Sequence, residues 1–429
     1  MPIRFSLQYI CSNQLQVPWE RESIETCTVM NSLGYGSQII QARGDAYRKH
    51  DRIGCSLFGS LTMITTGSKA EGVTSFFESD RDIMYVEKYI MCLEKDVSSY
   101  TLPMETTVFT LNTGVCYHGH CILVLERRGV NISNQVHNAL LAYENGRALL
   151  SSDLYVNAFD EALDVSAIER HERAGPSIPR SINGELHRIY HVDFVHSLRC
   201  YCPSIIRKWA ERRRRWPPPD VVHKVVSMGA FVTPVGFKGS EYKHVEWRIC
   251  FNTGENYLVS CLNNTQVYMY VLIKMIIKEV LKPLKKVLWI AEKNPQELFN
   301  ERTLFYWLRE VLVDLRSAIL TEHLSYFMIP ERNLMAACEM EECQKRVWVQ
   351  IITNMIEEGP NVLLRLPKIR KAIISHPEPL MWFRKKRLEL ELLSLKRMNR
   401  YGYLKNVIGV VTESDTMLQA INRRRYEII

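Results

Sequence analysis

The sequence predicts an α+β protein of two lobes, in which a half containing the strands is followed by an almost wholly helical half. Two observations support this. The chain has 429 residues, of which 46% are hydrophobic, enough for a large core shared by two lobes. Up to about residue 259 the chain alternates short apolar runs with turn-prone sequences, whereas afterwards apolar residues recur at helical spacing. We expect a cleft between the two lobes.

The elements of the first half follow from local patterns. Apolar residues at helical spacing predict helices, apolar runs with Thr, Val and Ile predict strands, and "GSKAEG" predicts a turn. In order, these are a helix over 30–52, strands over 57–66 and 78–86, strands over 104–111 and 120–127, a helix over 135–170, a strand over 187–200 and a short helix over 220–229.

The second half shows a succession of helical patterns with few strand signals. The predicted helices cover 264–281, 283–292, 302–322, 332–357 and 378–400. The longest apolar stretch, "VYMYVLIKMIIKEVL", is interrupted by Lys274 and Lys278 and is too short and too charged to span a membrane. It predicts a buried amphipathic helix, and we expect no membrane association.

Positive charge is concentrated along the chain. The formal net charge is +8, and two basic runs are "RKWAERRRR" from Arg207 to Arg215 and "FRKKRLELELLSLKRMNR" from Phe383 to Arg400. Clustered Lys and Arg attract a phosphate backbone. The alternative is a solvated, solubilising surface.

The cysteines and the N-terminal sequence indicate the cellular compartment of the protein. The twelve cysteines are scattered and several lie in apolar runs, as in a reducing compartment. "MPIRFSLQYICSNQ" has no apolar segment followed by a small-residue cleavage site. We expect a cytoplasmic protein, with the nucleus as a second location.

Three acidic residues, Glu78, Asp80 and Asp82, occupy every second position just before an apolar run. On a strand all three would point to one face, where carboxylates repel one another unless a cation neutralises them. Asp193 is a lone acid inside another apolar, β-branched run and is the candidate third acid. The alternative for Asp193 is a structural aspartate satisfied by backbone N–H groups.

A Gly-Ser pair precedes these acids. Gly67 permits a tight turn close to a phosphate, and Ser68 offers a hydroxyl and an N–H. Asp80 and Asp82 follow at a short interval, and with Asp193 they form a set that can hold two Mg²⁺ or Mn²⁺ ions. Glu78 is expected at the rim of the site.

The Gly-Ser pair followed by the D-x-D acids resembles the nucleotidyltransferase superfamily that includes poly(A) polymerases and oligoadenylate synthetases. Three further segments are similar to cyclic GMP–AMP synthase and the animal cGAS-like receptors of the Mab superfamily: "VEWRICFN", "VLIKMIIKEVL" and "LSYFMIPERNLM". "LRCYCPSIIRKWAERRRRWPPPDVV" resembles a segment of invertebrate members. The resemblance covers roughly residues 35–335.

This resemblance implies a bilobed nucleotidyltransferase fold, with a mixed β-sheet in the N-terminal lobe and a helical C-terminal lobe. It implies a core lobe with an N-terminal helix over 1–200 and a Mab-type helical lobe completing the cleft over 201–335; residues 336–429 would be a helical extension.

The family's roles carry over to matching positions. Gly67 and Ser68 would bind the triphosphate, and the three aspartates would ligate the two metal ions. Arg248 would contact the acceptor nucleotide, and Glu255 would lie near it. Lys274 would reach the phosphates; the alternative is a surface lysine with a buried stem.

The implied activity is synthesis of a cyclic dinucleotide second messenger from ATP, GTP or UTP in innate immune sensing, with a STING-like receptor for the product. The family's zinc thumb has no counterpart here, which favours double-stranded RNA as activator over double-stranded DNA. Candidate nucleic-acid contacts are Arg207, Lys208, Arg212, Arg213, Arg214 and Arg215.

We expect no structural zinc. The cluster "CYHGHC" (Cys116, His118, His120, Cys121) has the spacing of no standard finger. Two alternative functions remain: a catalytically inactive Mab-type scaffolding or developmental protein, and a template-independent polymerase that extends RNA tails.

Overall fold

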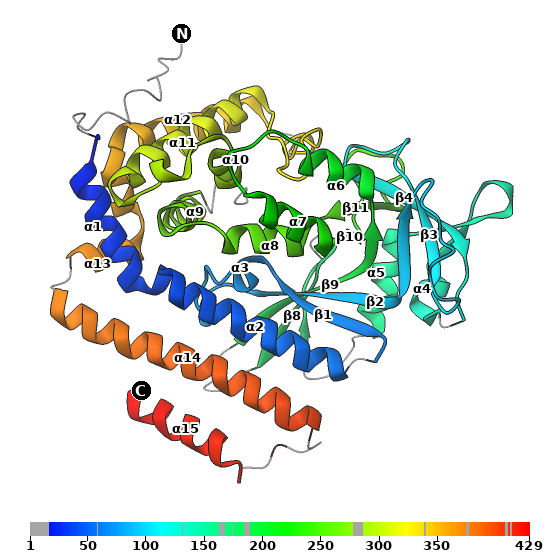
Figure 1. Ribbon diagram of the computed structural model, residues 1–429, viewed down its shortest axis with the longest axis horizontal. Helices are drawn as coiled ribbons and strands as arrows, with labels where there is room; N and C mark the ends of the chain where they lie inside the picture. Colours follow the sequence, from blue (N-terminus) through cyan, green and yellow to red (C-terminus); the bar gives the residue numbers. More distant parts are fainter. Residues whose placement is uncertain are drawn as a thin grey trace.

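The computed structural model has a sheet-containing lobe and a helical lobe (Figure 1). It describes residues 17–57, 59–130, 132–162, 168–173, 175–183, 189–277, 286–338, 340–374, 377–407, 411 and 414–429. The α+β fold class predicted from the sequence is confirmed.

Two N-terminal helices link the lobes. Helix α1 (Glu20–Met30) packs against the helical lobe, where Ser23 Oγ accepts a hydrogen bond from the N–H of Phe305 at 3.2 Å. A π-helical turn that contains Gly34 at φ 85° then redirects the chain. Helix α2 (Ser37–Leu57) continues along the sheet lobe (Figure 1).

One mixed sheet forms the centre of the first lobe. Its strand order is β1-β2-β3-β4-β11-β10-β9-β8-β7, with β5 and β6 as a side hairpin on β4, and β9 also pairs with β2. The β2–β3 and β2–β9 pairs are parallel and the other pairs are antiparallel. The strands are β1 (Leu61–Thr66), β2 (Arg81–Glu94), β3 (Thr107–Asn112), β4 (His120–Arg127), β5 (Leu140–Ala142), β6 (Ala148–Leu150), β7 (Ile168–Arg170), β8 (Ile178–Asn183), β9 (Ile189–Tyr201), β10 (Ala230–Thr233) and β11 (Glu246–Cys250).

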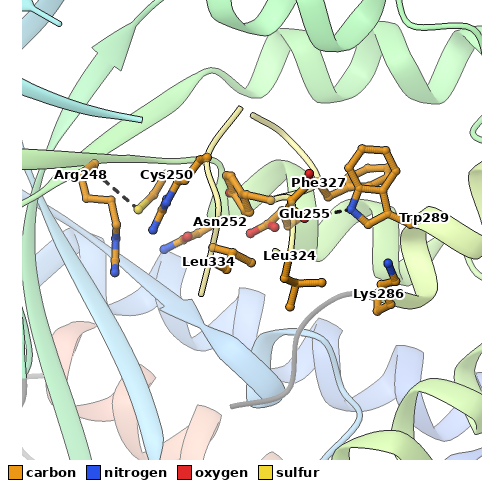
Figure 2. A pocket seen from close by; sticks show the side chains of 12 residues that line it. Arg248, Cys250, Asn252, Glu255, Lys286, Trp289, Leu324, Phe327 and Leu334 are labelled. Carbon is orange, nitrogen blue, oxygen red and sulfur yellow. Dashed lines mark hydrogen bonds between the residues drawn. The ribbon is translucent and has the colours of Figure 1, made fainter. Parts of the chain in front are cut away.

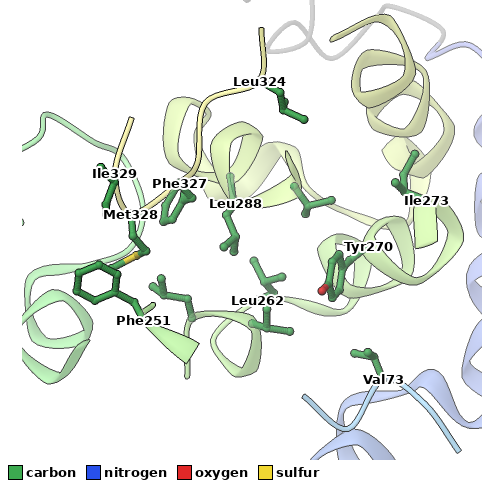
Figure 3. Packing of buried hydrophobic residues seen from close by; sticks show 14 of the residues in the cluster. Val73, Phe251, Leu262, Tyr270, Ile273, Leu288, Leu324, Phe327, Met328 and Ile329 are labelled. Atoms are coloured by element: carbon green, nitrogen blue, oxygen red, sulfur yellow. The ribbon is translucent and has the colours of Figure 1, made fainter. Parts of the chain in front are cut away.

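The helical lobe surrounds an apolar core. Figure 3 shows part of this core, which includes Tyr270 and Ile273 of α9 together with Leu288 and Phe327. Helix α9 is buried on nearly all sides, as expected for its apolar sequence. No helix among the described residues has the length and apolarity that crossing a membrane requires. The helices are α6 (Pro203–Ala210), α7 (Pro219–Met228), α8 (Asn252–Ser260), α9 (Asn264–Ile276), α10 (Lys286–Lys293), α11 (Leu304–Thr321), α12 (Glu342–Glu358) and α13 (Pro367–Ile374).

The C-terminal helices return to the first lobe. Helix α14 (Pro377–Val407) runs alongside α2, and α15 (Thr416–Ile428) packs on α14 (Figure 1). Asn399 Nδ2 donates to the carbonyl of Ala46 at 3.1 Å, and Asn406 Nδ2 donates to the carbonyl of Ile53. Because both residue numbers rise together, α2 and α14 run in the same direction.

Three local predictions were wrong. Strand β2 begins at Arg81, so Asp80 lies in the loop before it, where Ser79 has a φ of 62° that interrupts an extended chain. The stretch 135–170 is not one helix: a hairpin of β5 and β6 separates α4 (Asn134–Asn138) from α5 (Ser152–Ala162), because "ENG" forms a turn. Helix α12 begins at Glu342, since Asn333 forms a β-bridge with Ser325 and residues 334–337 form a turn.

Residues 278–285, which include the predicted end of one helix and start of the next, lie outside the described residues.

Candidate active site

Two aspartates face each other across the centre of the sheet. In the parallel β2–β9 pair, Asp82 lies opposite Asp193, and in the antiparallel β1–β2 pair Asp82 lies opposite Thr66. Partners in register project from the same face of a sheet, on strands about 4.8 Å apart. Sequence reasoning proposed that Asp193 comes from a strand beside Asp82, and the register has this arrangement.

Burial and neighbouring acids disturb the ionisation of Asp82. Burial raises the pKa of Asp82 to about 6, helped by the negative charges of Asp193 and Asp80. The Lys274 ammonium acts in the opposite direction. A bound cation would relieve this repulsion, because it favours the ionised carboxylates.

The third aspartate is less closely associated with the pair. Asp80 is exposed and lines a separate cavity of about 500 Å³ together with Phe76, Tyr190 and Met398. Within the described part of the chain, no three His, Cys, Asp or Glu side chains already converge closely enough to hold a metal ion. The oxygen-only donors of Asp82 and Asp193 fit Mg²⁺ or Mn²⁺ in ligand chemistry, but Asp80 would have to approach them.

The Gly-Ser pair lies at the end of β1. Gly67 has a φ of 64°, and a Cβ atom built on it would collide with Oδ2 of Asp82. This position therefore requires glycine for two reasons, backbone conformation and space. Ser68 follows in the one-turn helix α3 (Gly67–Ala70), where its Oγ accepts a hydrogen bond from Lys274 Nζ at 2.7 Å.

Lys274 connects the helical lobe to this turn. Its Nζ lies 3.3 Å from Oε2 of Glu71, and the hydroxyl of Tyr270 donates to the same carboxylate at 3.0 Å. The Glu71 side chain is only 1% exposed, so its charge is balanced inside the protein. Of these residues, sequence reasoning identified only Lys274. It treated Glu71 simply as part of the turn "GSKAEG". It also missed Tyr270, although the i,i+4 spacing between Tyr270 and Lys274 was an available signal.

Lys69 was also missed. Its buried Nζ donates to the carbonyls of Ser75 at 2.5 Å and Phe76 at 3.1 Å, and to that of Glu78. Burial lowers the pKa of Lys69 to about 8. Lys69 thus fixes the backbone of the loop that leads to Asp80.

A second pocket of about 220 Å³ contains Arg248 and Glu255 (Figure 2). Arg332, which sequence reasoning did not single out, also lines it, with its guanidinium 5.0 Å above the ring of Tyr326. Burial and the neighbouring Arg248 lower the pKa of Arg332. Two guanidinium groups that repel each other in one pocket favour an anionic ligand.

The basic run divides into two groups. Arg212 donates to Oε1 of Glu292 at 2.8 Å and lies over the ring of Trp289 at 4.3 Å, and Arg214 lies over the ring of Trp209 at 4.4 Å. These two arginines therefore make intramolecular contacts. The other four candidates, Arg207, Lys208, Arg213 and Arg215, are exposed. Their contact with nucleic acid stays a prediction.

The "CYHGHC" segment forms the turn into β4. Cys116 Sγ contacts the carbonyl of Asn112 at 3.8 Å, while Cys121 is fully buried and contacts the carbonyl of Trp247 at 3.6 Å. Burial lowers the pKa of His120 to about 3. The expectation of no structural zinc stays a prediction.

The two-lobed fold, with paired aspartates on adjacent strands beside a Gly-Ser turn, is consistent with a bilobed nucleotidyltransferase. Residues 135–260 match the family model of the Mab-21 protein nucleotidyltransferase domain. The match supports a relationship to the Mab21 and cGAS-like superfamily and a nucleotidyltransferase-like function. Asp193, Arg248 and Glu255 lie inside the matched segment, and Gly67 to Asp82 precede it. No curated protein matches the chain.

Proposed function

We propose that this protein is a nucleotidyltransferase that joins two nucleoside triphosphates into a cyclic dinucleotide second messenger for innate immune sensing. The observation that carries the proposal is the register of Asp82 against Asp193, next to the Gly67–Ser68 turn. A scaffold without activity would have no need for two mutually repelling, half-buried carboxylates. The inactive Mab-type scaffold is therefore the less favoured alternative.

The chain's own residues bind and orient the substrates. Ser68 and Lys274 would hold the triphosphate of the donor, because a hydroxyl and an ammonium 2.7 Å apart offer neighbouring donors to phosphate oxygens. The pocket of Arg248, Glu255 and Arg332 would hold the acceptor nucleotide. Binding both nucleotides in one cleft aligns the reacting atoms, which supplies much of the rate enhancement.

Asp82 and Asp193, joined by Asp80, would hold two Mg²⁺ or Mn²⁺ ions. Such ions lower the pKa of an attacking hydroxyl and neutralise a leaving pyrophosphate.

In the reaction, a 2′- or 3′-hydroxyl oxygen of the acceptor forms a bond to the α-phosphorus of the donor, and the bond from that phosphorus to pyrophosphate breaks. A site carboxylate, for which we propose Asp193, accepts the hydroxyl proton. A second transfer in the same cleft closes the ring and releases a second pyrophosphate.

We propose double-stranded RNA as the activator, with double-stranded DNA as the second candidate. The exposed Arg207, Lys208, Arg213 and Arg215 give a basic surface suited to a phosphate backbone. A STING-like receptor would bind the product, and the cytoplasm, with the nucleus second, would be the site of action.

The test is incubation of nuclease-treated protein with four labelled nucleoside triphosphates and Mg²⁺ or Mn²⁺, with and without double-stranded RNA or DNA. A small, phosphatase-resistant product that requires RNA supports the proposal, whereas a ladder of extended products indicates a polymerase. No product under any condition favours the scaffold. Full product without nucleic acid refutes the proposed activation.

A further inference from the structure

The loop that carries Asp80 is held by helices from the far end of the chain. This loop, residues 71–80, joins α3 to β2. Helices α13 and α14, roughly 300 residues later, contribute one carboxylate and two cations to it. None of these contacts belongs to the nucleotide pocket or the Asp82–Asp193 pair.

Glu391 of α14 makes the innermost contact. Its Oε1 accepts a hydrogen bond from the N–H of Phe76 at 2.6 Å. The same carboxylate accepts two hydrogen bonds from the guanidinium of Arg43 on α2, at 2.8 and 2.9 Å. The side chains of Arg43 and Glu391 are each 2% exposed. Arg43 also donates to the carbonyl of Gly72 at 3.2 Å. Glu391 and Arg43 therefore attach both halves of the loop to the α2–α14 pair.

Glu78 provides the outer contact. Its carboxylate accepts hydrogen bonds from Lys368 of α13, at 2.9 Å, and from Arg387 of α14. Lys368 also donates to the hydroxyl of Tyr35 at 2.7 Å. Glu78 is about one-third exposed, so this pair lies at the surface end of the loop. Because Glu78 precedes Asp80 by two residues, its position limits where Asp80 can lie.

We infer that the C-terminal clamp, defined as Glu391, Lys368 and Arg387 with their contacts to Phe76 and Glu78, positions the loop that carries Asp80. Glu78 and Glu391 are thus positioning residues, whereas Asp80 is the group that they place. Residues 377–407 would accordingly serve the site of the first lobe, although they follow the second lobe in the sequence. The catalytic consequence of the clamp rests on the proposed function, but the control of the loop does not.

The clamp has a physical rationale. To complete the proposed metal site, Asp80 must approach the Asp82–Asp193 pair against the repulsion between like charges. A loop attached only at its ends would leave Asp80 free to take many positions, at a cost in conformational entropy when it is placed in the site. Contacts from Lys69 on one side and from the clamp on the other restrict these alternatives. A displacement of about 1 Å at a catalytic group can reduce a rate about 100-fold.

Amide hydrogen exchange of the full chain, without ligand, tests the inference directly. In Lys368→Gln/Arg387→Gln we expect residues 76–80 to exchange about tenfold faster, because local opening becomes easier, while β2 and most of α14 keep their protection. Glu78→Gln removes the same contact from the other side and should give the same result. Lys368→Arg keeps the positive charge beside Glu78 and should leave the exchange of residues 76–80 close to that of the unaltered protein.

The matched control is Lys345→Gln, which removes an ion pair between Lys345 and Glu322 (2.7 Å) away from the loop. Unchanged exchange of residues 76–80 in both Lys368→Gln/Arg387→Gln and Glu78→Gln would overturn the inference. Faster exchange throughout α14 in these variants would also overturn it, because Lys368, Arg387 and Glu78 would then only hold α14 in place. If the double variant does not fold, Glu78→Gln decides alone.

Kinetics give the second measurement. If the protein makes a dinucleotide, Glu78→Gln should lower kcat about tenfold and leave KM for the nucleotides unchanged, since the clamp contacts no nucleotide pocket. A protein that makes no product but shows the predicted exchange retains the clamp and loses the proposed function. Unchanged exchange of residues 76–80 in the variants, together with normal product formation, would overturn the clamp and retain the proposed function.

Discussion

Asp82 on β2 lies directly opposite Asp193 on β9, and its carboxylate fills the space left by the missing side chain of Gly67. The segments that carry Gly67, Asp82 and Asp193 thus meet at one point of the sheet, although more than 100 residues separate the first from the last. Burial raises the pKa of Asp82 to about 6, and the negative charges of Asp193 and Asp80 add to this effect.

Neutralising either aspartate should abolish activity without harming the fold. We expect Asp82→Asn and Asp193→Asn to lower kcat/KM by at least about 10³-fold. Their melting temperatures should stay equal or rise, because each change removes one of two repelling charges. Asp153→Asn, at a half-exposed position of α5, is the matched control. A variant of Asp82 that keeps activity would mean that the site lies elsewhere.

Lys274 should matter for binding more than for the fold. Lys274→Met removes the ammonium that donates to Ser68 Oγ, and we expect KM for the triphosphate to rise about tenfold or more, as for a lost charge-assisted hydrogen bond. Calorimetric titration with a non-hydrolysable triphosphate checks this. Lys274→Arg, which keeps the charge, should lose less affinity. Equal affinity in the protein and in Lys274→Met would contradict the assignment.

Arg332 should contribute to nucleotide affinity, although no sequence pattern singled it out. We expect Arg332→Gln to weaken nucleotide binding about tenfold, and to change the free energy of unfolding by less than about 1 kcal/mol, because relief of repulsion from Arg248 offsets the lost contact with Tyr326. Denaturant unfolding and a binding titration of the same variant provide the comparison. A large loss of stability with intact binding would make Arg332 a structural residue only.

Glu87 of β2 should make stability depend on pH. Burial raises the pKa of Glu87 to about 7, with Ser133 opposing, so between its ordinary value and pH 7 the folded state holds a proton that the unfolded state lacks. Its stabilising contribution is therefore present at low pH and is lost as the pH rises through 7. Glu87→Gln should raise the free energy of unfolding at pH 8 by up to about 3 kcal/mol and make little difference at pH 4. A gain that is equal at both values would argue for packing instead of ionisation.

The basic run should separate into stability and binding. Arg212→Ala leaves the buried Glu292 without its closest cation and should lower the free energy of unfolding by about 3 kcal/mol. Arg213→Ala/Arg215→Ala changes two exposed side chains and should leave stability within about 0.5 kcal/mol. The same double variant should reduce the salt dependence of RNA binding, measured by anisotropy between low and moderate salt. RNA binding that is unaffected by this change would place the nucleic-acid surface elsewhere.

The sequence by itself determined the elements with strong periodicity and the residues whose chemistry is legible locally. The apolar run around Asp193 predicted a strand, and Gly67, Ser68 and Asp82 were selected by spacing and residue type. These predictions depend on neighbours within a few residues, where side-chain alternation and turn chemistry act.

Only the tertiary structure decided the contacts between distant segments. Three features have no local signal: the positive φ at Ser79, before β2 begins at Arg81, the contact of the Glu71 carboxylate with Lys274, and the contact of Glu391 with Phe76. The four consecutive arginines 212–215 also differ only in the neighbours that folding gives them, since Arg212 contacts Glu292 and Arg213 is exposed to solvent. Buried charge must find a partner wherever the fold brings one, and the fold is a property of the whole chain.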